Sequence, residues 1–174
     1  MKKQILIITL MLLSTVIFAQ KIEKETKIKS NHAVGVAGGP TIGCGLAYQY
    51  TYSKYSAQIT FLPYKNTNKE MYCIGLSFYY TLNQGQKTRL FLYQGNHYYY
   101  SKSEWESWNN EKESFIENDI DNYFNNSLGI GFDLTILDNV SLNIMAGYAG
   151  YENFTQLNLT GEISLLYHIP SKNK

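Results

Sequence analysis

Residues 127–150 alternate apolar side chains with small or polar ones, and this alternation is interrupted once near Asp138. A period of two predicts β-strands, because successive side chains of a strand point to opposite faces. The stretch therefore predicts a β-hairpin with one apolar face and one polar face. The apolar positions are Leu128, Ile130, Phe132, Leu134 and Ile136, then Leu142, Ile144, Ala146 and Tyr148.

The turn of this hairpin decides which residues pair across it. A two-residue turn at 138–139 would pair Ile136 with Ser141 and mix apolar and polar side chains on one face. Pairing Ile136 with Leu142 keeps the faces distinct, so the pattern predicts a three-residue turn at 138–140, or a five-residue opening. This register also predicts the cross-strand pairs Gly131–Gly147 and Phe132–Ala146.

The same reasoning predicts six further strands, at residues 33–39, 44–51, 56–61, 71–82, 88–100 and 157–169. Compact turns are expected at 51–54, 83–87 and 138–140. More exposed loops are expected at 39–42, 65–70, 101–126 and 152–155. Eight strands with short connections predict an all-β, eight-stranded antiparallel up-and-down barrel with both ends of the chain on one side.

Residues 101–126 differ from the predicted strands in composition. They carry seven acidic side chains and several aromatic ones, and the apolar positions have a roughly helical spacing. The segment therefore predicts a long acidic loop with a helical turn or two. Its candidate interaction residues are Trp105, Trp108, Phe115, Asp119 and Asp121.

The N-terminus predicts export from the cytoplasm. Lys2 and Lys3 precede an apolar run from Ile5 to Phe18, and Ala19 precedes a polar stretch. The run is too short for a spanning helix and has the organisation of a cleaved signal peptide. We therefore divide the chain into a signal peptide at 1–19, a periplasmic tail at 20–31, a barrel at 32–170 and a C-terminal tail at 171–174.

Charge and composition narrow the class of protein. The chain has 15 Lys and Arg and 14 Asp and Glu, and cleavage would remove Lys2 and Lys3, which leaves a net charge of about −1. This balance argues against nucleic acid as a partner. The two cysteines are predicted to face opposite sides of the sheet, since Cys44 has the parity of Leu46 and Cys73 that of Ser77; we expect no disulfide between them.

The distribution of charges predicts which face of the barrel points outward. A soluble, lipocalin-like barrel would need a charged outer face, but the polar face of these strands consists mostly of Gly, Ser, Thr, Asn and Gln. Its charges are nearly limited to Arg89, Asp133 and Glu162. We therefore expect the apolar face to meet lipid and the polar face to line the lumen. Tyrosines near strand ends fit the aromatic girdles of membrane barrels: Tyr48, Tyr50, Tyr72, Tyr80, Tyr98, Tyr100, Tyr148 and Tyr167.

Three segments carry a family resemblance: Phe18-Ala19-Gln20, the glycine-rich residues 34–41 and the residues 143–148. In these the chain resembles small outer-membrane barrels of Bacteroidetes-type bacteria and, more broadly, the OmpA/OmpX-like eight-stranded barrels. The resemblance implies a monomer in the outer membrane, in contact with membrane lipids and lipopolysaccharide, with no cofactor. The last strand departs from the pattern, because Ile169 stands where a terminal aromatic is common.

The three strand charges predict a cluster in the lumen. Eight strands leave an interior that side chains just fill, and an isolated charge there would be costly. We expect Arg89 to bridge Asp133, Glu162 or both. Such a cluster could gate a channel or seal it, and the filled interior favours a seal.

Two alternatives to a non-enzymatic surface protein remain open at this point. His97 lies close to Ser101 and Ser103, which is compatible with a lipid A-modifying barrel enzyme, although no third member of a triad is identifiable by spacing. A soluble periplasmic carrier is the other alternative. The acidic segment could bind a protein, a glycan or calcium-bridged lipopolysaccharide, but residues 118–122 lack the spacing of a calcium loop and predict no metal site.

Overall fold

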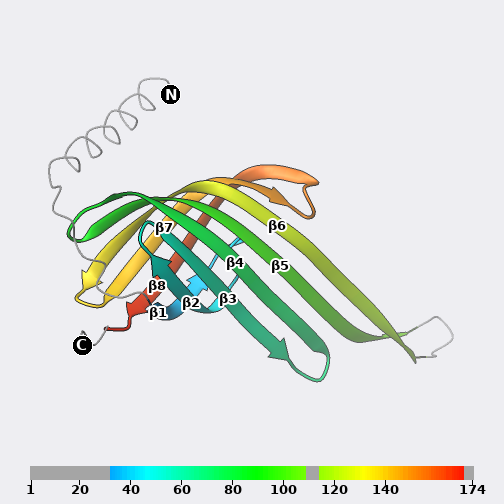
Figure 1. The fold of residues 1–174 in the computed structure, drawn as a ribbon. Coiled ribbons are helices and arrows are strands. Elements are labelled where there is room, and N and C mark those ends of the chain that lie inside the picture. Colours follow the sequence, from blue (N-terminus) through cyan, green and yellow to red (C-terminus); the bar gives the residue numbers. More distant parts are fainter. Residues whose placement is uncertain (1–31, 109–113, 171–174) are drawn as a thin grey trace, which may run out of the picture.

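The computed structural model describes residues 32–108 and 114–170, and the side chains of 32–104 and 119–170. The eight strands form one closed antiparallel barrel in which each strand pairs with the next and β1 pairs with β8 (Figure 1). This confirms the predicted all-β, up-and-down architecture. The strands are β1 His32–Gly38, β2 Gly45–Tyr52, β3 Tyr55–Lys65, β4 Lys69–Gln84, β5 Thr88–Trp108, β6 Ser114–Leu137, β7 Val140–Tyr151 and β8 Gln156–His168.

The predictions for the two ends of the chain receive no test from the structure. The predicted signal peptide at 1–19 and the tails at 20–31 and 171–174 lie outside the described residues. In the part of the chain that is described, no helix has the length and apolar character needed to cross a membrane.

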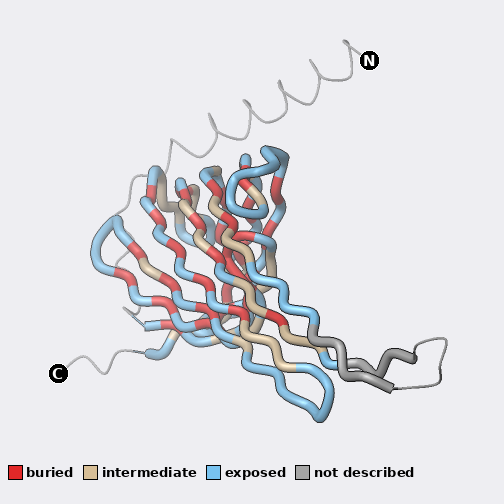
Figure 2. Tube along the Cα trace, turned by 90° about the vertical axis from the view of Figure 1, so that its right-hand side faces the viewer, coloured by how far each residue is buried: buried red, intermediate tan, exposed pale blue. Residues whose placement is uncertain are grey.

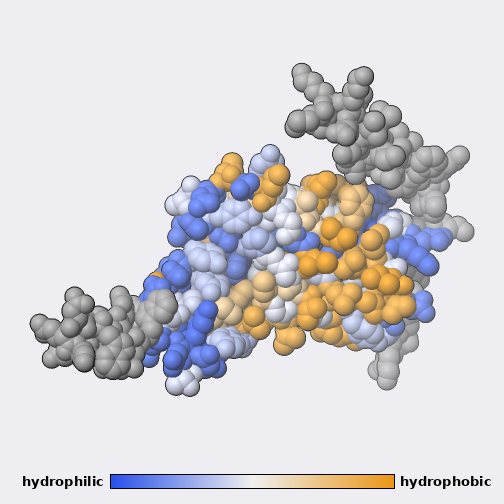
Figure 3. Space-filling model, turned by 180° about the vertical axis from the view of Figure 1, so that it is seen from behind, coloured by the Kyte–Doolittle hydropathy of each residue, from blue (hydrophilic) through white to orange (hydrophobic). Residues whose placement is uncertain are grey.

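The barrel is polar inside and apolar outside. Along the strands, buried and exposed residues alternate (Figure 2). On β6, Ile130 and Phe132 expose 52% and 39% of their surface, whereas Ser127 and Asp133 expose 1% and 6%. Hydrophobic residues gather over the barrel wall, and hydrophilic residues cover its extended end (Figure 3). An apolar exterior on a closed barrel is the arrangement that lipid requires, because closure pairs every strand edge.

The strands have unequal lengths. β1 and β2 have 7 and 8 residues, whereas β5 and β6 have 21 and 24. β2 pairs with β3 only as far as Phe61, and β7 pairs with β6 only as far as Asn126. Beyond these points β3 to β6 continue as a four-stranded extension past one rim (Figure 1). We call this part the outer sheet; it comprises residues 62–73, 99–108 and 114–125.

The prediction of a long loop at 101–126 is wrong. β5 continues to Trp108 and β6 begins at Ser114, with unbroken pairing from Tyr99–Tyr123 to Trp108–Ser114. The predicted loop at 65–70 is likewise shorter, since β3 ends at Lys65 and β4 begins at Lys69. Residues 101–126 show none of the regular apolar alternation on which the strand predictions relied.

The predicted register of the β6–β7 hairpin is also wrong. Leu137 pairs with Val140, so the turn has the two residues Asp138 and Asn139. The register shifts between Thr135 and Leu137, and this bulge at Ile136 restores the separation of apolar and polar faces. The observed pairs are Gly129–Gly147, Gly131–Met145, Phe132–Ile144 and Leu134–Leu142.

Candidate functional site: the barrel lumen

An ion pair lies in the end of the lumen where β1 begins and β8 ends. Arg89 Nη2 lies 3.0 Å from Asp133 Oδ2, and both side chains are buried, with exposed fractions of 11% and 9%. Register places them directly opposite each other on β5 and β6. Arg89 Nη1 also donates to Ser56 Oγ at 3.3 Å. The opposite charges of Arg89 and Asp133 therefore compensate each other within the lumen.

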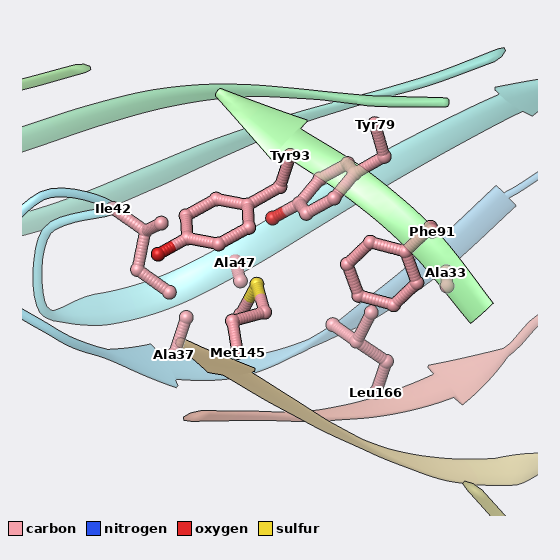
Figure 4. Close-up of a cluster of buried hydrophobic side chains, with 9 residues drawn as sticks. All are labelled: Ala33, Ala37, Ile42, Ala47, Tyr79, Phe91, Tyr93, Met145 and Leu166. Atoms are coloured by element: carbon pink, nitrogen blue, oxygen red, sulfur yellow. The ribbon is translucent and has the colours of Figure 1, made fainter. Parts of the chain in front are cut away.

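Aromatic and apolar side chains fill the middle of the lumen (Figure 4). Tyr79 and Phe91 meet edge to face, with ring centroids 5.3 Å apart. The guanidinium carbon of Arg89 lies 5.2 Å from the Phe91 ring centroid, which joins this layer to the ion pair. Phe91, Met145 and Leu166 are almost completely buried. Eight strands leave an interior of about the width that such side chains fill.

The loop between β1 and β2, residues 39–44, folds into the opposite end of the lumen. We call it the plug loop. Thr41 and Ile42 have no exposed surface, and Figure 4 shows the Ile42 side chain among the lumen residues. The prediction of an exposed loop at 39–42 is therefore wrong. The sequence pattern missed it because the loop is held by contacts with distant strands.

Hydrogen bonds from four strands hold the plug loop. His97 Nδ1 and Asn125 Nδ2 both donate to the carbonyl oxygen of Pro40, at 2.8 and 2.9 Å. The Thr41 hydroxyl bonds to Ser127 and to Glu162. The backbone N–H of Cys44 donates to Cys73 Sγ at 2.9 Å. The loop is thus fastened along its length by β4, β5, β6 and β8.

Two inward-facing glycines make room for the plug loop. A Cβ built at Gly75 would overlap the backbone carbonyl of Ile42, and one built at Gly95 would lie 2.8 Å from the carbonyl oxygen of Thr41. Gly43 has a φ of +77°, which favours glycine, where the loop turns back toward the wall. These glycines at lumen positions are the sequence signal that could have revealed the loop.

Glu162 does not join the other two strand charges. Arg89 pairs with Asp133, whereas Glu162 lies beneath the plug loop and accepts hydrogen bonds from Thr41 and from Thr160, the latter at 3.2 Å. The three residues predicted to form one cluster therefore lie at two levels of the lumen. One level holds an ion pair, and the other anchors a loop.

His97 has structural partners at both ring nitrogens. Nδ1 donates to the Pro40 carbonyl, so Nε2 is available to accept from the Cys73 thiol, 3.1 Å away. Neither contact involves Ser101 or Ser103, the pair considered for an enzyme. Cys44 is exposed, Cys73 is buried and both are free thiols, in agreement with their predicted opposite faces.

The predicted interaction residues lie in the outer sheet. Asp119 and Asp121 are exposed on β6, opposite Ser103 and Ser101. Trp105, Trp108 and Phe115 belong to the paired strands, but their side chains lie outside the described part of the structure. Among the described residues, no group of three or more His, Cys, Asp or Glu side chains could hold a metal ion.

Comparison with solved structures finds one of the same fold. The chain is similar to the N-terminal β-barrel domain of Pseudomonas aeruginosa OprF, with a TM-score of 0.51 and 10% identity over 80% of this chain and 98% of that one. Neisserial surface protein A (NspA) is matched with a TM-score of 0.44 and 14% identity, over 80% of this chain and 93% of that one. No family model and no curated protein sequence matches. The fold is an eight-stranded antiparallel β-barrel, as in the OprF domain.

Proposed function

We propose that this protein is a non-enzymatic outer-membrane barrel with a closed lumen, which contributes to envelope integrity or surface interaction through the outer sheet. The plug loop is the observation that carries the proposal. A loop hydrogen-bonded to four strands is poorly suited to opening for solutes, and below it lie an aromatic layer and a buried ion pair. What remains for interaction is the surface beyond the membrane.

Conductance tests the closed lumen. The wild-type protein in planar lipid bilayers should give no steady channel current. Gly75→Val should expel the plug loop, since its side chain would occupy the place of the Ile42 carbonyl, and current should appear. Gly161→Val is the matched control, because nothing lies within 4 Å of a Cβ at that outward position. Both variants are first checked for folding by their migration in unheated gels.

Two outcomes would count against the closed lumen. Steady current through the wild-type protein would show that the contents of the lumen move aside. A folded Gly75→Val barrel that remains silent would show that the plug loop is not the seal.

Thiol labelling on intact cells tests which end faces outward. In a Cys44→Ser background, a membrane-impermeant maleimide should label Asp121→Cys in the outer sheet. It should not label Lys87→Cys, which lies in the β4–β5 turn, at the end of the barrel where β1 begins and β8 ends. Lysis should make the second position reactive. The reverse pattern would place the outer sheet in the periplasm and refute a surface role.

A further inference from the structure

A cavity of about 410 Å³ opens at the mouth of the barrel, directly above the plug loop. Its floor is Pro40, and its walls come from β5, β6, the β7–β8 connection and β8. We propose that this mouth cavity binds a neutral saccharide of one or two sugar units. The inference rests on the proposed outward orientation of the outer sheet. The wall residues that carry the argument are Tyr123, Asn125, Tyr151, Glu152, Gln156 and Asn158.

The chemistry of the lining selects the class of ligand. Its described lining residues include one carboxylate, Glu152, and neither Lys nor Arg, so a phosphate or another anion would meet repulsion without a counter-charge from them. An acyl chain would cover the amides of Gln156 and Asn158 without bonding them, which is unfavourable. Hydroxyl groups both donate and accept, so they can satisfy the amides and the carboxylate together. A sugar ring also has C–H faces that tyrosine rings can cover.

The cavity is held in shape by contacts that exist without a ligand. Tyr123 stacks on Tyr99 with ring centroids 4.8 Å apart and an interplanar angle of 19°. The Tyr151 hydroxyl donates to the Leu159 carbonyl at 3.1 Å. The floor is fixed because Asn125 donates to Pro40. A preformed site loses less entropy on binding than one that must be assembled.

The wall that carries Glu152 is built from strained backbone. Glu152, Asn153 and Phe154 have φ angles of 49°, 59° and 68°, a left-handed run of three residues that are not glycine. The run is held against β6, because the N–H of Glu152 donates to Asn125 Oδ1 and that of Asn153 to the Phe124 carbonyl, both at 2.9 Å. Gln156 in turn donates to the Glu152 carboxylate at 3.3 Å. Strain maintained in this way is characteristic of binding sites, and here it places the carboxylate at the cavity.

Binding is tested on the full folded protein in detergent, by saturation-transfer NMR followed by calorimetry. The probes are glucose, galactose, mannose, N-acetylglucosamine, lactose and maltose, with inorganic phosphate as the anionic probe. We expect at least one neutral sugar to bind and phosphate not to bind. Glu152→Gln should weaken that sugar at least tenfold, since it removes the carboxylate and keeps the size of the side chain. Asp121→Asn, which removes a carboxylate from the outer sheet, should leave the affinity unchanged.

Delipidated oligosaccharide from lipopolysaccharide distinguishes the two sources of such a sugar. Tighter binding of this probe than of the simple sugars would assign the cavity to the membrane's own glycolipid, and weaker binding would assign it to free or foreign glycans. Binding of phosphate, absence of all sugar binding, or equal affinity in Glu152→Gln would overturn the inference. If the sugar inference fails but the wild-type protein gives no channel current and the outer sheet is labelled on intact cells, the proposed function stands without the inference.

Discussion

Ile120 and Ile130 lie on the same strand, face the same side and expose almost the same fraction of their surface, 53% and 52%. Their surroundings differ. Ile130 belongs to an apolar run that continues through Phe132, Leu134 and Ile136, whereas Ile120 is followed on its face of the outer sheet by Asn122. The exposed fraction of a side chain therefore does not by itself predict whether the residue meets lipid or water. The polarity of its neighbours on the same face of the strand is the better predictor.

The ion pairs of β5 show the same contrast. Arg89 and Asp133 expose only 11% and 9% of their side chains, within the lumen. Lys102 and Glu104 expose 33% and 44% in the outer sheet, with 2.6 Å between their charged atoms. A close contact is worth little where water competes for both charges, and much where removal of one leaves the other buried. The barrel should thus depend on its buried pair and not on its exposed one.

The largest effect is expected from breaking the buried pair. Arg89→Ala leaves Asp133 buried without its counter-charge and should lower the free energy of unfolding by about 3–5 kcal/mol. Lys102→Ala should change it by less than about 1 kcal/mol. Urea titration in detergent, followed by migration of the folded form in gels, measures both. Equal effects would remove the distinction between the two regions.

The next effect sharpens the comparison between the two isoleucines. Ile130→Arg puts a charge against lipid and should cost about 2 kcal/mol. Ile120→Arg should stay within about 0.5 kcal/mol, since the side chain there meets water. The measurement is reversible urea unfolding in lipid vesicles. If Ile120→Arg proves the more costly, the outer sheet lies in the membrane or against a partner.

The smallest effect concerns the plug loop. Thr41→Val keeps the shape of the side chain but removes the hydroxyl that bonds to Ser127 and Glu162. The loss should be about 1–2 kcal/mol, the typical cost of leaving buried polar groups without a partner. Thr155→Val, in the exposed β7–β8 turn, is the matched control and should be neutral. A neutral result for Thr41→Val would mean that the loop is held by other contacts.

The sequence predicted the barrel where one face of a strand meets lipid and the other meets a packed lumen, as on residues 127–136. It failed at residues 101–126, because the polar, apolar and aromatic residues there follow no period of two. The register was missed because one bulge, at Ile136, reverses the parity that the argument assumed. The plug loop was missed for a different reason: its partners are distant strands, which local patterns do not reveal.

The plug loop also constrains the order in which this barrel can be assembled. Thr41 meets Ser127 and Glu162 across 86 and 121 positions of the chain, so its seat is incomplete until β6 and β8 are in place. β8 is also the strand that closes the barrel against β1, at the foot of the same loop. Insertion of the plug loop and pairing of β1 with β8 are therefore coupled steps. The barrel closes around a loop that belongs to its own first hairpin.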